Sequence, residues 1–507
     1  MNNIFGKAAK NATITLILQA MSLLFSFLSR TVFIKLLTVE YLGVSGLFSN
    51  ILTILSFAEL GIGNVMIYSL YAPVKQQNNG RIVSLLKLYK KAYIIISSII
   101  LFIGIALTPA VPYLVKKVPD VKEDIRFLFV LFLLNTYVSY WFSYKKALLQ
   151  ADQKSYIITL FSNIGHIVLF CAQVAVLYCF HSYTLYLICQ IVSTLAINVV
   201  LSIIVNHSYK ETLKAVPDDL DRSFIKELAK KVKSLAISRV SGIVSNGVDN
   251  IIISRFFGLS SVGFVSNYTL ITSSVNGLFF PVLTSLSSGI GKANVDNSVE
   301  NKRSIFREIS ISVYFIYSFI TTCIFVLAHP FIVQWIGESY LISTWSLLHL
   351  SIGIFVAGIN YPVYSYRTTS GYFKEAQNAY VMCALSNLIL SLIFAKIYGI
   401  PGVFMATWIS KLIPEFWDSR VTYEKILNLP HWHYYIRYLQ YFVLQAANTG
   451  ICWIVTAQIP AGSWLMIIIK ALVCGLINII INYIVLAHLP EVKSVISRSI
   501  NLVKARR

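Results

Sequence analysis

The sequence predicts an all-α integral membrane protein with about fourteen transmembrane helices. Three observations support this class: the composition, a series of apolar runs and the distribution of basic residues. The 507-residue chain is 57% hydrophobic and only 12% charged, with a mean hydropathy of +0.71. Soluble domains carry roughly 25% charged residues. A bilayer accommodates this much apolar side chain, whereas one soluble core of this length does not.

The apolar runs are each long enough to cross a hydrocarbon core about 30 Å thick as a helix of roughly 20 residues. They are too long and too uniformly apolar for the alternating strands of a membrane barrel. The runs lie near residues 12–36, 45–70, 92–115, 127–149, 156–179, 182–205, 234–257, 264–290, 308–333, 342–366, 376–397, 401–417, 439–458 and 463–487.

The basic residues alternate between the two sides of the predicted membrane. With the N-terminus inside, roughly 31 Lys and Arg fall on cytoplasmic segments and about four on outer loops, as the positive-inside rule requires. An odd number of spans would destroy this alternation, so we expect both termini in the cytoplasm. The net charge of +21 is then explained by basic residues that orient the chain in the membrane and contact lipid headgroups. We therefore expect no nucleic-acid partner.

An internal repeat divides the predicted helices into six, six and two. Residues 29–48 align without gaps on residues 249–268, which pairs Lys35 with Arg255 and Gly43 with Gly263. Six spans per repeat give both halves the same orientation, and the site of such transporters normally lies between the two lobes. We predict an N-terminal six-helix lobe (1–207), a cytoplasmic linker with an amphipathic helix (208–233), a C-terminal six-helix lobe (234–420), and two extra helices with a basic cytoplasmic tail (421–507).

Two cytoplasmic segments carry apolar residues at helical spacing among lysines. They are residues 220–232 and 489–503, and either is suited to lie on the anionic inner leaflet. For the first, an ordinary connecting helix packed on the bundle is an equal alternative.

The first predicted helix carries a polar stripe on one face: Thr15, Gln19, Ser22, Ser26 and Arg30. This spacing keeps all five side chains within a narrow sector. A charged side chain at the bilayer centre costs roughly 2.5–3.5 kcal/mol on insertion scales, so it faces the bundle interior. We expect Arg30 to face a cavity, whereas Ser22 and Ser26 suit a cavity or close helix packing equally.

The seventh predicted helix carries a corresponding polar half, and its apolar residues occupy the other half. Under the repeat alignment Gln19 matches Arg239 and Ser26 matches Asn246. The polar half comprises Ser238, Arg239, Ser241, Gly242, Ser245, Asn246, Asp249 and Asn250. Two corresponding polar helices, one in each repeat, predict a water-filled cavity between the lobes.

Other ionisable residues in the apolar runs allow several roles. Glu59 is placed to pair with Arg30 or to carry a proton, while Lys411, Glu415 and Asp418 near a cytoplasmic end suit a solvated ion-pair cluster. No G-x-x-x-x-G-K-[ST] motif is present, and the seven cysteines lack metal-ligand spacing, so we expect no nucleotide cofactor and no metal.

Four segments of this chain resemble a known family. Arg30 to Gly43, Ala58 to Gly63, Ser69 to Tyr71 and Gly399 to Thr407 look like polysaccharide-exporting flippases of the MOP superfamily. These are Wzx-type translocases of lipid-linked oligosaccharides, related to lipid II flippases and to MATE exporters. The resemblance covers the whole chain in topology: two six-helix lobes plus two further helices.

The resemblance implies a transporter and not an enzyme. Its substrate would be an undecaprenyl-pyrophosphate-linked oligosaccharide repeat unit, moved from the cytoplasmic to the outer leaflet of the bacterial inner membrane by alternating access. The product would feed a surface polysaccharide such as O-antigen or capsule, with membrane lipids, a polymerase and chain-length machinery as partners. The expected cavity residues are Arg30, Lys35, Gln19, Ser26, Arg239, Asn246, Asn250 and Arg255, and the expected ion-coupling residues are Glu59 and Asp249.

Two other functions remain open on the sequence alone. A MATE-like exporter of small molecules would share the fold, although cationic substrates favour carboxylates over the basic cavity expected here. A membrane-embedded glycan polymerase or glycosyltransferase is the alternative from a different class. Such an enzyme normally needs paired carboxylates and a larger external loop, and the first outer loop offers only Glu40.

Overall fold

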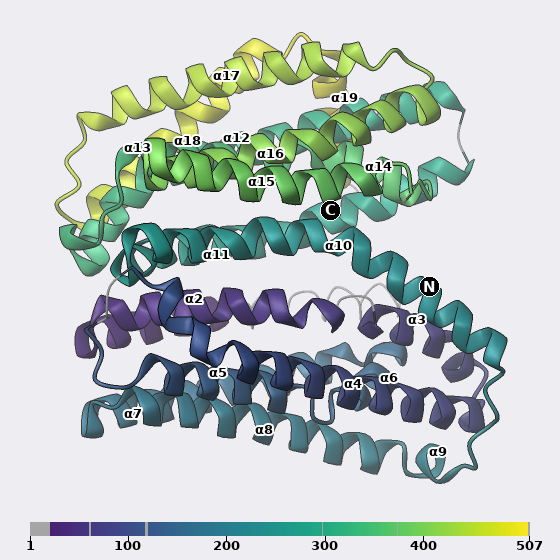
Figure 1. The fold of residues 1–507 in the computed structure, drawn as a ribbon. Helices are drawn as coiled ribbons and strands as arrows, with labels where there is room; N and C mark the ends of the chain where they lie inside the picture. Colours follow the sequence, from purple (N-terminus) through teal and green to yellow (C-terminus); the bar gives the residue numbers. More distant parts are fainter. Residues whose placement is uncertain (1–20, 60–61, 117–119, 297, 373, 505–507) are drawn as a thin grey trace. The chain divides into compact units, whose positions relative to one another are not determined.

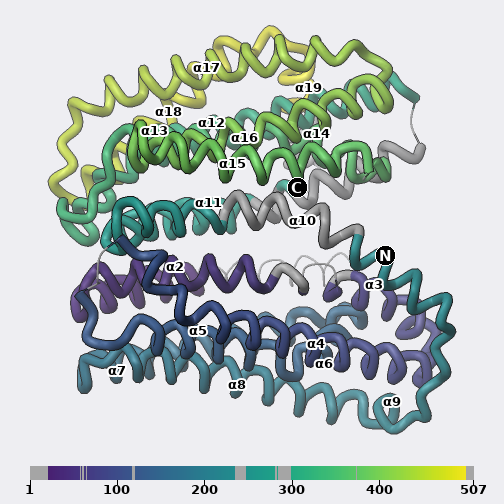
Figure 2. Tube along the Cα trace, viewed as in Figure 1, coloured from purple at the N-terminus to yellow at the C-terminus, as the bar shows by residue number. Residues whose placement is uncertain are grey.

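The structure is a computed structural model that describes residues 21–59, 62–116, 120–296, 298–372 and 374–504 (Figure 1 and Figure 2). Within these ranges, side chains are not described for residues 57, 58, 64, 234–246, 280–282, 284–296 and 498–504. The described part of the chain is helical and contains no strand, which confirms the predicted fold class. The chain divides into two compact units, Met1–Gly263 and Phe264–Arg507.

Helices lie at the positions of the predicted apolar runs. The first unit holds a helix over residues 21–36, α2 (Val39–Leu55), η1 (Ser56–Glu59), α3 (Ile62–Lys75), α4 (Asn79–Leu107), η2 (Thr108–Leu114), α5 (Ile125–Ser139), α6 (Ser143–Ala151), α7 (Ser155–Phe180), α8 (Tyr183–Ser208), α9 (Lys210–Lys214) and α10 (Arg222–Phe257). α11 (Leu259–Asp296) begins in the first unit and continues in the second.

The second unit continues with α12 (Val299–Ile336), η3 (Glu338–Tyr340), α13 (Thr344–Ile359), α14 (Tyr361–Thr369), α15 (Gln377–Tyr398), α16 (Ile400–Arg420), the π-helical turn η4 (Val421–Ile426), α17 (Trp432–Ala457), α18 (Trp464–Leu486) and α19 (Pro490–Lys504). Capping side chains explain several helix starts, because each accepts a hydrogen bond from a first-turn amide. Asn78, Asp124, Ser182 and Ser463 do so for α4, α5, α8 and α18.

Length and composition separate two groups of helices. Seven helices of the described residues are long and apolar enough to cross a membrane, or eight if the bent pair α5 and α6 forms one span. The long helices α10, α11, α16 and α17 fall outside that group because polar side chains interrupt their apolar stretches. With α5 and α6 counted as one span, these groups give twelve spans among the described residues, and the 21–36 helix and the α2–α3 pair bring the total to fourteen, which is consistent with the predicted count.

Two predicted spans are interrupted in the structure. The run near 45–70 is not one helix, because the 3-10 turn η1 separates α2 from α3. The run near 127–149 bends by 42° between α5 and α6, where Phe142 has a left-handed backbone with φ 62. Hydropathy averages over such breaks, since the flanking residues remain apolar.

The first unit has one extended apolar core. In it α4, α5, α7 and α8 lie side by side (Figure 1). Phe48, Leu70, Leu85, Phe129 and Leu148 are completely buried in this core.

The linker segment near 220–232 is the first part of α10 and not a separate helix. Leu228 is buried, and Phe224 packs on the core beneath the guanidinium of Arg81, 4.3 Å from the ring centre. The structure therefore shows this segment as the start of a long helix that packs on the first unit through Phe224 and Leu228.

In the second unit, polar side chains connect α12 to the last two membrane helices. Asn478 Nδ2 donates to Thr322 Oγ1 at 3.1 Å, and Asn482 Nδ2 donates to Ser318 Oγ at 3.0 Å. Gln445 Nε2 also donates to Thr322 Oγ1, at 3.1 Å. Because lipid offers no competing partner, such bonds hold helices together where apolar contact alone does not. α17 and α18 are thus fixed to α12 from within one network.

The predicted solvated ion-pair cluster on α16 is wrong. Glu415 and Asp418 are 4% and 3% exposed. Asp418 Oδ1 pairs with Arg367 Nε at 2.6 Å, and Tyr380 donates to its other oxygen at 2.8 Å. Glu415 accepts a hydrogen bond from Tyr434 at 2.6 Å. Local spacing suggested exposure because the partners lie on other helices.

α19 confirms the predicted tail helix and adds where its apolar face lies. Val492 is buried, and Leu489 and Val495 pack on the same core of the second unit. Ser494 Oγ donates to Glu308 Oε1 of α12 at 2.7 Å. Part of the apolar face is therefore covered by protein, while Ile496 is 39% exposed.

The aligned glycines of the repeat meet where α2 passes the first turn of α11. A methyl group on Gly43 would overlap the carbonyl oxygen of Leu259, and one on Gly263 would overlap that of Val39. Under the repeat alignment Val39 corresponds to Leu259, so the two contacts are equivalent. Only glycine permits this close approach of two helix backbones. The two contacts are thus related by the offset of 220 residues that the alignment gives.

A second contact crosses the same place. Ser260 Oγ donates to Glu40 Oε1 at 3.0 Å, and these residues are separated by 220 positions, the same offset as the repeat. Glu40 also accepts from the backbone amide of Asp120. The carboxylate therefore joins α2, the loop before α5 and the start of α11 within the first unit.

Candidate functional site

Glu59 lies at the centre of a group of tyrosines in the first unit. Tyr93 of α4 donates to Glu59 Oε1 at 3.0 Å, and Tyr140 at the end of α5 donates to Oε2 at 2.8 Å. Tyr89, one turn before Tyr93, donates in turn to the Tyr93 hydroxyl at 2.8 Å. Both carboxylate oxygens thus accept hydrogen bonds from phenols.

The break between α2 and α3 places Glu59 in this group. η1 ends at Glu59, and the tyrosines approach from α4 and α5. Tyr93 is 6% exposed and lies edge-on to Tyr140, with ring centres 5.4 Å apart. Burial leaves few water molecules to compete, so these hydrogen bonds are stronger than they would be at the surface.

Arg30 lies beside a second aromatic group in the same unit. It interacts electrostatically with Tyr183 and Tyr186 of α8, whose rings stack with centres 5.8 Å apart. Phe33, one turn along the helix, contacts both rings edge-on. Ser45 of α2 shares a hydrogen bond of 2.6 Å with the Tyr183 hydroxyl. The guanidinium is thus surrounded by phenols of α8 and by its own helix.

The rest of the predicted polar stripe is divided among different surroundings. Gln19 lies outside the described residues. Ser22 Oγ donates to Asn163 Oδ1 of α7, so this serine takes part in helix packing. Ser26 is exposed and donates to the backbone oxygen of Ser22 at 2.8 Å.

The predicted residues of α10 also differ in their surroundings. Asn250 is half-buried and faces Gly46 of α2, and Asp249 is half-buried beside it. Arg255 is exposed near the end of α10, as is its repeat equivalent Lys35 on the 21–36 helix. The side chains of Arg239 and Asn246 lie outside the described residues. The cavity role of all these residues remains a prediction.

These groups offer charge and hydrogen bonds within apolar helices. The Glu59 group provides a half-buried carboxylate among phenols, whereas the Arg30 group provides a half-buried cation beside phenols. Sequence reasoning found both charged residues but none of the tyrosines. Glu59 and Tyr140 are 81 residues apart, and no periodic pattern connects them.

Comparisons with solved structures show which fold this is. The lipid II flippase MurJ superimposes with a TM-score of 0.67 at 15% identity, over 94% of this chain and 99% of that one. A multidrug resistance MATE family transporter of the MOP superfamily gives 0.61 at 14% identity, over 79% of this chain and 95% of that one. A MOP superfamily transporter from Pyrococcus furiosus gives 0.52 at 14% identity, over 81% and 94%.

Comparison with sequences identifies a family, whereas the solved structures show only the fold. No curated protein sequence matches the chain. The family model described as polysaccharide biosynthesis protein matches residues 8–287, which is more than half of the 507 residues. This range contains Arg30, Glu59, Asp249 and the aligned glycines. The chain therefore belongs to the polysaccharide biosynthesis protein family, and it shares its fold with the solved structures named above.

Proposed function

We propose that the protein is a flippase for a lipid-linked oligosaccharide. Its substrate is an undecaprenyl-pyrophosphate-linked repeat unit, carried from the cytoplasmic to the outer leaflet by alternating access between the two repeats. The pyrophosphate and the sugars are strongly hydrated, and hydrocarbon offers no replacement for that water. A polar, cationic path through the protein supplies the missing hydrogen bonds and charge.

The family match over residues 8–287 carries this proposal. The likeness to MurJ, a lipid II flippase, agrees with it in fold. Arg30 agrees with it in charge, because a half-buried guanidinium beside phenols favours an anionic ligand. We assign pyrophosphate or acidic-sugar contacts to Arg30, Arg239, Lys35 and Arg255, and sugar contacts to Gln19, Ser26, Asn246 and Asn250.

Glu59 is our candidate for ion coupling, with Asp249 as the second. A proton or cation that binds Glu59 competes with the hydroxyls of Tyr93 and Tyr140 for its oxygens. Occupancy of Glu59 therefore rearranges the contacts between η1, α4 and α5. A coupling ion would therefore bind one conformation of the protein more tightly than the other. Any ion-driven transporter requires such a difference in affinity.

The test measures the leaflet in which the lipid-linked repeat unit accumulates in a deletion strain. Accumulation on the cytoplasmic side supports flipping, whereas accumulation on the outer side supports the polymerase alternative. Re-expression of the wild type restores export, and Arg30→Ala and Arg239→Ala variants at equal membrane level restore less. Arg126→Ala, at an exposed position in the first turn of α5, is the matched control. Undiminished export in both cavity variants would sink the cavity assignment.

A MATE-like exporter is the second candidate, supported by the superposition on a MATE family transporter. Such a protein would lower the accumulation of cationic dyes in cells. In the deletion strain, increased dye accumulation with normal surface polysaccharide would favour export of small molecules. The reverse pattern would favour the flippase.

A further inference from the structure

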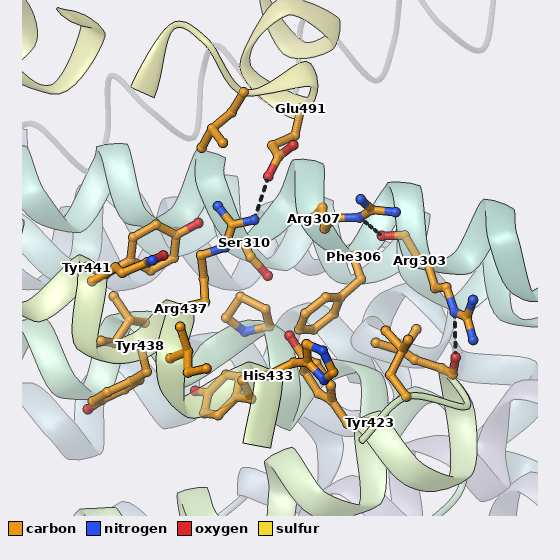
Figure 3. Close-up of a pocket in the computed structure, with 18 of the residues that line it drawn as sticks. Arg303, Phe306, Arg307, Ser310, Tyr423, His433, Arg437, Tyr438, Tyr441 and Glu491 are labelled. Carbon is orange, nitrogen blue, oxygen red and sulfur yellow. Dashed lines mark hydrogen bonds and ion pairs between the residues drawn. The ribbon is translucent and has the colours of Figure 1, made fainter. Parts of the chain in front are cut away.

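A pocket of about 570 Å³ lies within the second unit, apart from the Glu59 and Arg30 groups (Figure 3). Its walls come from the beginning of α12, the turn η4, the beginning of α17 and the start of α19. Pockets of roughly 300–1,000 Å³ are the usual size for bound small molecules. The pocket therefore has room for a ligand larger than a single ion.

The pocket is strongly basic. Arg303 and Arg307 of α12 and Arg437 of α17 line it. Among the described residues that line it, Glu491 supplies the one carboxylate, which lies 3.1 Å from Arg437 and is 6% exposed. Figure 3 shows this pair across the pocket from the two arginines of α12. One of the three arginine charges is neutralised within the protein, which leaves two.

The two arginines of α12 lie one turn apart and meet only neutral oxygens. Arg303 donates to the backbone oxygens of Leu427 and Asn428 at 2.7 and 2.6 Å, which fixes its guanidinium at the rim. Arg307 donates Nε to the backbone oxygen of Arg303 at 3.4 Å and is otherwise exposed. Neither residue forms an ion pair within the described part of the chain. Their charge is therefore available to an anionic ligand.

Hydroxyl groups add neutral donors to the same pocket. Ser310 Oγ lines it, is buried, and finds no hydrogen-bond partner among the described residues. Burial raises the pKa of Tyr423 to about 12, although Arg437 and Arg307 lower it, so this phenol keeps its proton at neutral pH. An unpartnered buried hydroxyl beside unpaired arginines is costly unless a ligand satisfies it.

The predicted spans place the pocket at the level where a membrane has its phosphates. Arg303 and Arg307 come just before the apolar span near 308–333, and Arg437 just before the span near 439–458. Glu491 follows the span near 463–487. All of them lie on the side that the charge distribution predicts to be cytoplasmic. Basic pockets between helix ends on that side suit lipid headgroups.

We propose that this pocket binds the phosphate groups of an anionic lipid in the cytoplasmic leaflet, and that it prefers two phosphates to one. Two unpaired guanidinium groups one helical turn apart match two phosphates in charge, and arginine binds phosphate in a forked geometry. A polyprenyl diphosphate and a phospholipid with two phosphates share this chemistry. The assignment concerns binding alone, so it stands or fails separately from the flippase function.

The test measures lipid binding to the purified full-length protein in detergent by native mass spectrometry. The probes are farnesyl diphosphate, cardiolipin, phosphatidylglycerol and phosphatidylcholine. Arg307→Gln removes one of the two unpaired charges, and the double variant Arg303→Gln, Arg307→Gln removes both. Arg420→Gln is the matched control, because Arg420 is exposed and pairs with Glu424 outside the pocket. Thermal unfolding shows whether each variant is folded.

We expect the two-phosphate probes to bind at least tenfold more tightly than phosphatidylcholine and more tightly than phosphatidylglycerol. Arg307→Gln should weaken them about tenfold and the double variant Arg303→Gln, Arg307→Gln about a hundredfold, with Arg420→Gln within twofold of wild type. Binding of farnesyl diphosphate alone assigns the pocket to the polyprenyl lipid, and binding of cardiolipin alone assigns it to a phospholipid. Equal binding of all four probes, or equal loss in Arg307→Gln and Arg420→Gln, overturns the proposal.

Discussion

The Nε atom of Arg367 lies 2.6 Å from Oδ1 of Asp418, and both side chains are only 4% exposed. Arg367 also donates to the backbone oxygen of Tyr372 at 2.7 Å, and Tyr380 donates to the second carboxylate oxygen at 2.8 Å. The pair therefore joins α14, α15 and α16 in the second unit.

Removing one member of this pair leaves a buried charge without a partner. We expect Asp418→Asn to lower the free energy of unfolding by about 3–5 kcal/mol, measured by thermal or denaturant unfolding in detergent. Arg420→Gln is the control, since its pair with Glu424 is exposed and is worth about 0.3–0.5 kcal/mol. The double variant Arg367→Met, Asp418→Leu should be more stable than Asp418→Asn, and equal losses in all three would contradict this account.

The tyrosines around Glu59 should be coupled to it in energy. Hydrogen bonds to charged groups contribute about 1.5–3 kcal/mol each, so Tyr140→Phe and Tyr93→Phe should each destabilise the protein by an amount in that range. In a Glu59→Gln background the same changes should cost less, which a double-mutant cycle measures. Tyr113→Phe, at a residue 78% exposed, is the control. Strict additivity would show that the hydrogen bonds contribute nothing.

The glycine contact between α2 and α11 predicts a steric effect. Gly43→Ala and Gly263→Ala each place a methyl group against a backbone carbonyl, which cannot move without shifting a helix. Overpacking of this kind costs about 1–3 kcal/mol. Gly450→Ala, on α17 with no atom within 4 Å of the added methyl, should be neutral or stabilising. A Tm for the first two variants at or above that of the control would refute the contact.

Acidification should weaken a contact in the loop between α6 and α7. Asp152 lies 2.7 Å from Lys154 and accepts from Tyr209 at 2.6 Å. Burial raises the pKa of Asp152, whereas the hydrogen bonds from Lys154 and Tyr209 lower it. Their combined effect is larger than that of burial, so the pKa of Asp152 lies below its ordinary value. A lowered pKa stabilises the fold above the ordinary value of 3.8, and this contribution disappears as the pH falls through the folded value.

The corresponding measurement compares Tm between pH 7 and pH 3 for wild type and Asp152→Asn. The variant should be slightly less stable at pH 7, by about 1 kcal/mol or less for so exposed a pair, and this difference should shrink as the pH falls toward 3. Asp219→Asn, at an exposed position in the loop before α10, should follow the wild-type curve. Parallel curves for wild type and Asp152→Asn would exclude this contribution.

Hydropathy predicted the helices well because membrane spans are set by local composition. Their breaks were missed, since η1 and the bend at Phe142 lie within residues that remain apolar. The charged residues were found but their surroundings were not. Asp418 meets Arg367 from 51 positions away, so local spacing suggested solvent where the structure has a buried pair.

The basic pocket is a second case in which the sequence showed the charged residues but not what surrounds them. Arg303, Arg307 and Arg437 were visible in the sequence as charges that orient the chain in the membrane. Only packing brings α12 and α17 together around one space. The repeat was predictable for the opposite reason: its evidence is an alignment of the chain with itself, which needs no knowledge of distant contacts.

The reciprocal contacts of Gly43 with Leu259 and of Gly263 with Val39 have the form of an isologous interface, in which each side presents the same patch to the other. Glu40 and Ser260, which touch across it, occupy equivalent positions of the two repeats. These equivalent positions differ in chemistry: one side presents a carboxylate that accepts the hydrogen bond, and the other a hydroxyl that donates it.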